Sequence, residues 1–241
     1  MFKYRSKENE LMDLENFDEV LSEQSFRFIE NVNRFFGGIR IVKKFVFSES
    51  RRLGRKRTLR ILDMGSGSCD IPVEVCKKAV KSGIPLEFTC IETNLHAVTR
   101  ARKLLNKNPG LPVRILQEDI FQHTTDSPYD IAIGSMFFHH LQDQEILTLI
   151  EQLRTIVKGA VMLNDLERCW PNYIGALLLT LPESPGVRND ALVSVRKGFT
   201  LKDLSQLLGK LPSTVFKVKR LFFYRIAAVI RLASHSNQRS V

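Results

Sequence analysis

From residue 59 onward, short apolar runs alternate with stretches in which apolar residues recur at helical spacing. The runs are typical of buried β-strands, and the stretches are typical of amphipathic helices. The pattern predicts strands at 59–64, 86–92, 113–116, 129–135 and 160–164, with helices at 71–82, 95–106 and 144–156 between them. Alternating strands and helices form a parallel sheet, and right-handed crossovers place helices on both faces. We therefore expect a doubly wound α/β fold.

The N-terminal part of the chain follows a helical pattern only. Apolar residues recur at helical spacing through 13–47, and the pair Gly37-Gly38 interrupts the pattern. Residues 1–50 are therefore expected to form an N-terminal helical cap, followed by the main domain at 51–233.

Beyond the alternating region, two further strands are predicted. Thr200 is placed to cap a helix at 200–208. The apolar runs at 215–219 and 222–230 lie too close together for a helical crossover, so an antiparallel hairpin is expected. The hairpin completes a seven-stranded, mostly parallel, Rossmann-like sheet. The polar tail at 234–241 is expected to be disordered.

The stretch at 166–198 is irregular and rich in proline, and it follows the end of a strand. We interpret it as an insertion that covers the substrate. Within it, residues 174–181 are almost wholly apolar. A buried helix is the favoured interpretation. The alternative is contact with an apolar, lipid-like substrate, in which case the protein would associate weakly with a membrane surface.

The chain is basic, with a formal net charge of +10 over 241 residues. Such a charge favours anionic partners, but a basic surface that only aids solubility is the favoured interpretation, and nucleic acid is not the expected partner. The four cysteines form no CxxC pair, so we expect free thiols and no metal site. The charged start of the chain resembles no signal peptide, and a cytoplasmic location is expected.

The strongest chemical signal is a glycine loop at 61–70, where a predicted strand is followed by Gly65, Gly67 and then a helix. Ligands of open α/β sheets bind beyond the carboxyl ends of strands. A dinucleotide loop has a third glycine where this chain has Asp70, and Asp63 adds a second acid directly before the loop. Two acids would repel a pyrophosphate. They suit S-adenosylmethionine (SAM), which carries an ammonium and a sulfonium and no phosphate.

Two further acids follow the next strands. Glu92 ends the second predicted strand, where a carboxylate can bind both hydroxyls of a ribose. Asp119 follows the third strand and is placed to accept from the adenine amino group. A single acid here would more often be a helix cap or a solvated loop residue. Three acids in this order favour a nucleoside cofactor.

The segments ILDMGSGSCDIP, CIETN, QEDI and YDIAIGSMFFHHL, in this order, resemble the class I SAM-dependent methyltransferases over residues 59–165. Outside that range, NVNRFFGG, NDLER, VSVRKGFT and FFYRIAAVIR resemble the bacterial ubiquinone/menaquinone-type and phenolic-lipid small-molecule methyltransferases. The resemblance implies SAM as cofactor, with S-adenosylhomocysteine (SAH) as product. It assigns SAM binding to Asp63, Gly65, Gly67, Glu92, Thr93, Asp119, Ile120, Ser135 and Met136. Cys69 departs from the family, which usually has glycine there.

Methyl transfer to a hydroxyl group also needs a base. The candidates are His139 and His140 after the fourth strand and Asp165 after the fifth. A structural role for the histidines, as cap and packing residue, is an equal alternative. His140 is narrowly preferred as the base, and Asp165 would act directly or orient the base.

Four residues of the 166–198 region are expected on the substrate side: Arg168, Trp170, Tyr173 and Arg196. An arginine and aromatic rings suit a flat, acidic acceptor. The leading interpretation is O-methylation of a phenolic or quinone-like small molecule. Alternatives are C-methylation of a quinone precursor, RNA methylation and a non-catalytic SAM-binding subunit.

Overall fold

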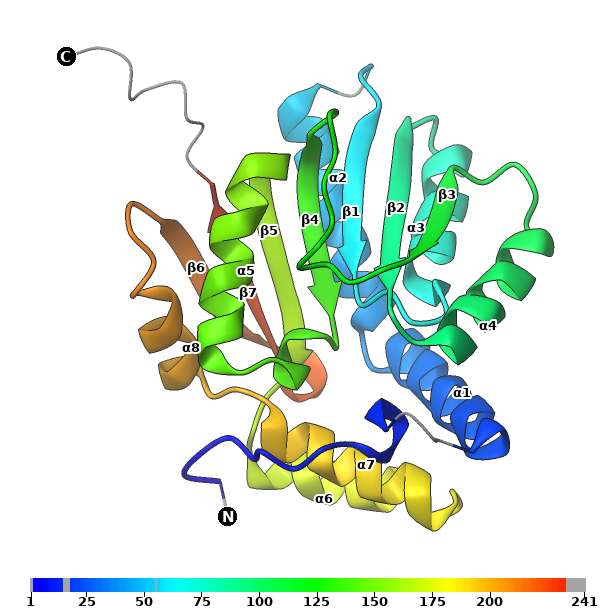
Figure 1. The fold of residues 1–241 in the computed structure, drawn as a ribbon, viewed down its shortest axis with the longest axis vertical. Helices are drawn as coiled ribbons and strands as arrows, with labels where there is room; N and C mark the ends of the chain where they lie inside the picture. The colour runs from blue at the N-terminus through cyan, green and yellow to red at the C-terminus, as the bar shows by residue number, and fades with distance from the viewer. Residues whose placement is uncertain (1, 15–17, 55, 233–241) are drawn as a thin grey trace.

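The computed structural model describes residues 2–14, 18–54 and 56–232, so the expected disorder at 234–241 lies outside the described residues. A single sheet carries helices on both faces (Figure 1). Its strands are β1 (Leu59–Met64), β2 (Leu86–Glu92), β3 (Val113–Gln117), β4 (Tyr129–Ser135), β5 (Val157–Leu166), β6 (Val215–Leu221) and β7 (Arg225–Arg231). The α-helices are α1 (Glu19–Phe35), α2 (Gly38–Leu53), α3 (Asp70–Lys81), α4 (Leu95–Asn106), α5 (Asp143–Ile156), α6 (Trp170–Leu179), α7 (Pro185–Lys197) and α8 (Leu201–Leu208). Three 3-10 turns are η1 (Leu11–Asp13), η2 (Phe138–His140) and η3 (Phe222–Tyr224).

The strand order is β3-β2-β1-β4-β5-β7-β6. The first five strands pair in parallel, and β7 runs antiparallel to both β5 and β6. The predicted seven-stranded, mostly parallel sheet with a C-terminal hairpin is confirmed. The strand order reverses between β1 and β4, which is where open α/β sheets bind ligands, beyond the carboxyl ends of the strands.

The sheet divides the interior into two apolar cores. Leu62 of β1 packs into the core under α5 and α8, and its neighbour Ile61 packs into the core under α2 and α3. Successive residues of a strand point to opposite faces, so the continuous apolar runs of the central strands serve both cores.

Side-chain caps mark the N-termini of the helices α4 and α8. The Asn94 side chain accepts from the backbone N–H of Ala97, 3.1 Å away, at the start of α4. Thr200 and Asp203 form a reciprocal capping box at the start of α8, as the spacing predicts. These caps fix where the chain leaves the sheet and re-enters a helix.

The N-terminal region differs from a uniform cap. α2 packs against the sheet with Val42 and Val46 in the core, so it is one of the helices that cover the sheet and is not part of a separate cap. α1, α6, α7 and the N-terminal segment (residues 2–14) gather at the carboxyl end of the parallel strands (Figure 1). The irregular pattern at 166–198 resolves into the two helices α6 and α7, with proline in the first turn of each.

The apolar run at 174–181 is helical up to Leu179, but none of the residues of α6 is buried. The favoured interpretation of a buried helix is therefore wrong. Helical periodicity shows that a segment forms a helix, but it does not show that another layer covers it. No helix in the described parts of the chain is long and apolar enough to cross a bilayer.

Candidate active site

A cavity of about 1030 Å³ lies at the carboxyl ends of the parallel strands. The loops after β1, β2, β3 and β4 line one half of it, which we call the strand-end half. Side chains of α1, α6, α7 and the N-terminal segment line the other, which we call the covering half. Every residue that the sequence assigned to SAM lines this cavity: Asp63, Gly65, Gly67, Glu92, Thr93, Asp119, Ile120, Ser135 and Met136.

The glycine loop has a backbone that side chains rarely tolerate. Gly65 has φ 60°, and a Cβ atom there would collide with the ring of Phe137. Gly67 has φ 52° and open space where its Cβ would be, so a ligand can approach the backbone closely. Cys69 is also left-handed, at φ 60°, which gives a physical reason why glycine suits this position.

Glu92 closes the loop against the next strand. Its carboxylate accepts from the backbone N–H groups of Gly67 at 2.8 Å, Thr93 at 2.9 Å and Asn94 at 3.0 Å. Asp119 accepts from the N–H of Phe121 at 2.9 Å and lies on the same side of the cavity. The backbone therefore fixes both acids at the positions that the sequence predicts.

The strand-end half concentrates carboxyl groups with little water around them. Burial raises the pKa of Asp63 well above its usual range, and the charges of Asp70 and Glu92 raise it further. Burial also raises the pKa of Glu92, although its three backbone N–H donors oppose this, and it raises the pKa of Asp70 to about 7. A ligand that brings positive charge or hydroxyl donors would relieve this burial cost.

After β4 the chain turns sharply beside the cavity. Met136 has φ 58°, and its N–H donates to the carbonyl of Asn164 at 2.9 Å. The Asn164 side chain donates to the hydroxyl of Ser135 at 2.8 Å. Left-handed backbone at a non-glycine residue costs energy and persists where the surroundings hold it, as at many ligand sites.

His139 and Asp165 form a fully buried pair at the ends of β4 and β5. Nδ1 of His139 lies 2.7 Å from Oδ1 of Asp165, and the backbone N–H of His139 donates to Oδ2 at 3.0 Å. The carboxylate therefore fixes the ring and keeps the proton on Nδ1, which leaves Nε2 on the cavity side. Asp165 does not line the cavity and contacts it only through His139.

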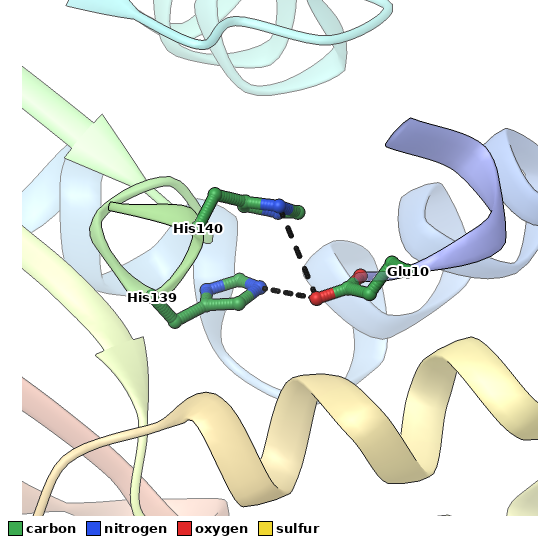
Figure 2. Close-up of side chains that lie close together, drawn as sticks. All are labelled: Glu10, His139 and His140. Atoms are coloured by element: carbon green, nitrogen blue, oxygen red, sulfur yellow. Dashed lines mark ion pairs between the residues drawn. The ribbon is translucent and has the colours of Figure 1, made fainter. Parts of the chain in front are cut away.

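Nε2 of His139 faces Glu10, a residue of the N-terminal segment that the sequence did not single out. Their closest atoms are 3.5 Å apart, and neither Nε2 nor this carboxylate oxygen has a hydrogen-bond partner (Figure 2). His140 lies beside the same oxygen at 3.9 Å and pairs more closely with Asp13 at 2.9 Å. His140 is partly exposed, whereas His139 is buried.

Opposite charges stabilise this arrangement. Burial alone would lower the pKa of His139, but the charge of Asp165, the hydrogen bond to Asp165 and the nearby carboxylate of Glu10 raise it to about 9. Burial alone would raise the pKa of Glu10, but His140, His139 and Lys197 hold it far below its usual range. With Glu10 in place, His139 is an imidazolium between two carboxylates.

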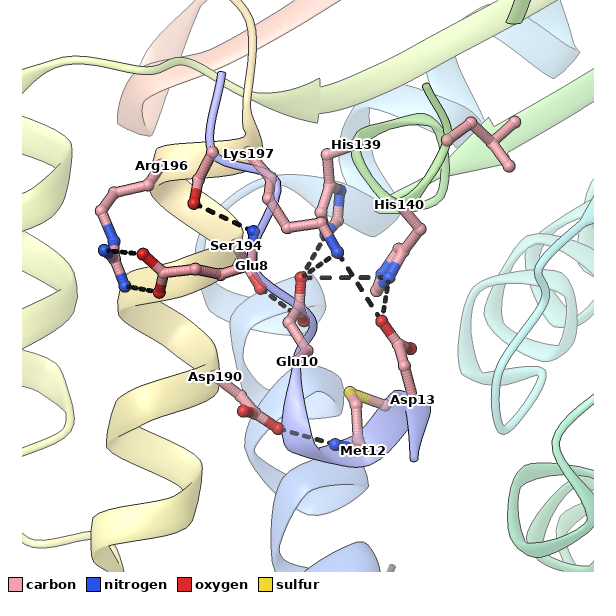
Figure 3. Close-up of polar contacts among 12 residues, drawn as sticks. Glu8, Glu10, Met12, Asp13, His139, His140, Asp190, Ser194, Arg196 and Lys197 are labelled. Carbon is pink, nitrogen blue, oxygen red and sulfur yellow. Dashed lines mark hydrogen bonds and ion pairs between the residues drawn. The ribbon is translucent and has the colours of Figure 1, made fainter. Parts of the chain in front are cut away.

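Glu10, His139 and His140 are also close enough together to hold a metal ion (Figure 2). However, the Lys197 ammonium lies 3.4 Å from the same oxygen of Glu10 and 3.6 Å from Asp13 (Figure 3). A lysine beside the ligands would repel a divalent cation and already neutralises the carboxylate. We therefore interpret Glu10, His139 and His140 as a cluster of ionisable side chains and not as a metal site.

The N-terminal segment is attached to the rest of the molecule by side chains (Figure 3). Glu10 accepts from the hydroxyl of Ser194 at 2.7 Å, and Asp190 accepts from two backbone N–H groups of the segment. Further contacts are the ion pairs Glu8–Arg196 and Arg5–Asp143. The segment therefore places Glu10 over the histidines from outside the sheet.

A buried arginine also faces the cavity. Arg225 is 1% exposed, lines the cavity and leaves its Nη1 without a partner. Burial lowers its pKa to about 10, against the charges of Asp165 and Asp70. Arg225 was not among the predicted site residues, because it lies in an apolar run that was interpreted only as a strand of the C-terminal hairpin.

The four residues expected on the substrate side do not line the cavity. Arg168 is buried and donates to Asp203 and to the carbonyl of Gly198, and Arg196 pairs with Glu8 on the surface. Trp170 is 56% exposed, and Tyr173 packs against Phe2. The side chains of these four residues make contacts outside the cavity lining instead.

The lining of the covering half is mostly apolar. α1 contributes Phe26, Phe28, Ile29, Val32 and Phe36. α6 and α7 contribute Ala176, Leu179, Val187, Ala191 and Val195. This half suits a ligand with a sizeable apolar part.

Comparison with known proteins supports the fold. Residues 61–159 match the family model described as a methyltransferase domain. The plantazolicin methyltransferase BpumL in complex with SAH is similar in structure, with a TM-score of 0.64 and 16% identity over 88% of this chain and 94% of that chain. Magnesium protoporphyrin IX methyltransferase from Synechocystis PCC 6803 with bound SAM has a TM-score of 0.55 and 13% identity over 83% of this chain and 81% of that chain.

A putative O-methyltransferase from Nostoc punctiforme PCC 73102 has a TM-score of 0.57 and 12% identity, and the match covers 81% of this chain and 56% of that chain. No curated protein matches the sequence. The predicted fold is confirmed by these structures, and residues 61–159 are similar to the methyltransferase domain.

Proposed function

We propose that this methyltransferase domain transfers the methyl group of SAM to an oxygen atom of an apolar, phenolic or quinone-like small molecule and releases SAH. The observation that carries the proposal is the division of one cavity into an acid-rich strand-end half and an apolar covering half. The buried pair His139–Asp165 lies at the ends of β4 and β5, beside that cavity. The phenolic or quinone-like character follows the resemblance in the sequence.

The strand-end half fits SAM. Glu92 is held by backbone donors with its carboxylate beside the glycine loop, in the place of a ribose-binding acid. Asp63 is a buried carboxyl group that a nearby ammonium would stabilise. Arg225, with a free donor toward the cavity, would bind the carboxylate of the methionine part. The structural neighbours crystallised with SAM or SAH support this assignment.

The covering half fits an apolar acceptor. Its aromatic and aliphatic lining offers few polar partners, so most of the acceptor would be held by burial of apolar surface. The names of the neighbours give plantazolicin and magnesium protoporphyrin IX, which supports an acceptor outside the nucleic acids.

Bound SAM supplies an electrophilic methyl group on sulfur, and the protein contributes mainly orientation. His139 would take the proton of the acceptor hydroxyl, because Asp165 holds its Nδ1 and leaves Nε2 at the cavity. Glu10 faces Nε2 and raises the pKa of His139, so displacement of Glu10 by the acceptor would lower that pKa and increase the share of neutral imidazole. Nε2 of His139 would accept the hydroxyl proton, while bound SAM would supply the methyl group and leave as SAH. The geometry favours His139 over His140 for this role.

Calorimetric titration with SAM, and separately with NADH, tests the cofactor. We expect micromolar SAM binding and no NADH binding. Glu92→Ala should weaken SAM binding about 10- to 100-fold, since hydrogen bonds to a charged group are lost. The control is Glu87→Ala, on the solvent-exposed part of the same strand. The acceptor is tested by methyl transfer to a long-chain alkylphenol and to a short phenol.

Absence of SAM binding would overturn the proposal that SAM is the cofactor. SAM binding with transfer to neither phenol would overturn it at the acceptor. Equal rates with the two phenols would contradict a role for the apolar covering half.

A further inference from the structure

One side of α6 is apolar and open to solvent. Residues spaced at i, i+4, i+7, i+8 and i+11 share one side of a helix. On α6 and the two residues after it, this side carries Trp170, Ile174, Leu177, Leu178 and Leu181, which are 56%, 50%, 37%, 60% and 58% exposed. The whole stretch 169–182 has no charged residue. A helix that is apolar all round is normally covered by another layer.

The opposite side of the same helix lines the cavity. Asn172, Gly175, Ala176 and Leu179 belong to the lining. α6 is therefore a single helical wall with the cavity on one side and solvent on the other. An apolar acceptor would meet apolar surface on both sides of this wall.

The turn η3 extends the exposed surface. Phe222 is 89% exposed, Phe223 53% and Tyr224 44%, and η3 touches α6. Phe223 and Tyr224 also line the cavity and have left-handed backbones, at φ 58° and 52°. We call the outer side of α6 and η3 together the apolar patch. The patch and the cavity are thus continuous through the side chains of η3.

Basic segments adjoin the apolar patch. Phe36, at the end of α1, meets Phe223 with ring centroids 5.4 Å apart. The sequence around it, 31–48, contains Arg34, Arg40 and two lysines and no acid. Likewise, no acid follows Asp203, and the strand that leads into η3 carries exposed Lys217 and Lys219, whereas the neighbouring Arg220 pairs with Glu167. Exposed apolar surface edged by cations has the chemistry of sites that bind anionic lipid surfaces.

We propose that the apolar patch docks on an anionic lipid bilayer, and that the acceptor passes between the bilayer and the cavity along α6 and η3. Trp170 and Phe222 would insert at the level of the headgroups, where aromatic side chains are enriched. The docking stands on the exposed residues and the adjoining charge. Only the passage of the acceptor rests on the proposed function.

The protein contains a single tryptophan, and it lies on the patch. Its fluorescence therefore reports on docking without a label. Addition of phosphatidylglycerol/phosphatidylcholine vesicles should move the emission of Trp170 to shorter wavelength. Lipids with brominated acyl chains should quench it. Neutral phosphatidylcholine vesicles should bind more weakly, and added salt should weaken the binding to anionic vesicles.

The test variant is Ile174→Ser with Leu178→Ser, since both side chains point away from the cavity. We expect its affinity for anionic vesicles to fall more than tenfold. The matched control is Val20→Ser with Val80→Ser, two equally exposed valines outside the patch. SAM titration of each protein checks that the site is intact.

No quenching in the wild-type protein, or equal vesicle binding by the test variant, would overturn the docking proposal. Concentration-dependent self-association that the test variant abolishes would overturn it in favour of an interface between two copies. SAM binding without vesicle binding would overturn the docking proposal and leave the proposed function intact. Vesicle binding without SAM binding would overturn the proposed function and leave the docking proposal intact.

Discussion

The two halves of the cavity are held by different kinds of contact. In the strand-end half, the carboxylate of Glu92 is fixed by backbone N–H groups of its own loop and the glycine loop. In the covering half, Glu10 is held by the side chains of Ser194 and Lys197, and Glu8 by Arg196. Backbone contacts within the sheet loops change only when the sheet itself opens. Exposed pairs such as Glu8–Arg196 stabilise by about 0–1 kcal/mol each, so we expect the N-terminal segment to open more readily than the sheet, with the buried Glu10 as its strongest attachment.

The largest effect is expected from Asp165→Asn. This residue contacts His139 at the strand ends. The change keeps the size of the side chain but removes the charge that orients His139 and raises its pKa. We expect kcat to fall about 10²- to 10⁴-fold, the usual contribution of a general base, with little change in SAM affinity. Steady-state kinetics and SAM titration measure the two effects. Asp126→Asn, in an exposed loop, is the control. An unchanged kcat would show that His139 is not the base.

Glu10→Gln tests the covering half and should have a smaller effect. A base must lose its proton to act, so the rate rises with pH through the pKa of His139. Glu10 raises that pKa. Its removal should therefore move the rising limb of the kcat/KM–pH profile to lower pH, by about one unit. Glu8→Gln, on the same segment but paired with Arg196, should leave the profile in place. A shift to higher pH would contradict the role given to Glu10.

The smallest effect is expected from salt, which should change the hydrogen-exchange rate of the N-terminal segment but not that of β1. Raising NaCl from about 0.05 M to about 1 M shortens the screening length to about 3 Å and weakens exposed ion pairs. Hydrogen exchange in residues 5–13 should become several-fold faster, because ion pairs such as Glu8–Arg196 attach the segment. Exchange in 59–64 should stay constant, because β1 pairs with strands on both sides. Mass spectrometry of the exchanged protein measures both ranges. Equal acceleration in both would show that the segment does not open on its own.

The strand-end half could be predicted from the sequence because its signals are local. A strand, a turn and an acid follow one another within a few residues at Asp63, Glu92 and Asp119, and the sheet brings those turns together. The topology follows from the alternation of strands and helices, and this part of the prediction was confirmed.

The covering half gave no comparable signal. Glu10 lies in a charged stretch without periodicity, and its partners Ser194 and Lys197 lie near the other end of the chain. Arg168 looked available for substrate, but the capping acid Asp203 and a backbone carbonyl engage it. Such pairings depend on how distant elements pack, which no local pattern records.

The direction of β7 has a practical consequence. This strand runs antiparallel to β5, so its last residue, Arg231, pairs with Ala160 at the end of the sheet opposite the cavity. Phe2, in contrast, meets the ring of Trp170 edge to face beside the patch, with ring centroids 4.7 Å apart. A purification tag, fluorescent fusion or surface linker joined after the last strand would leave the site accessible. The same attachment before Phe2 would crowd the face through which we expect the acceptor to enter.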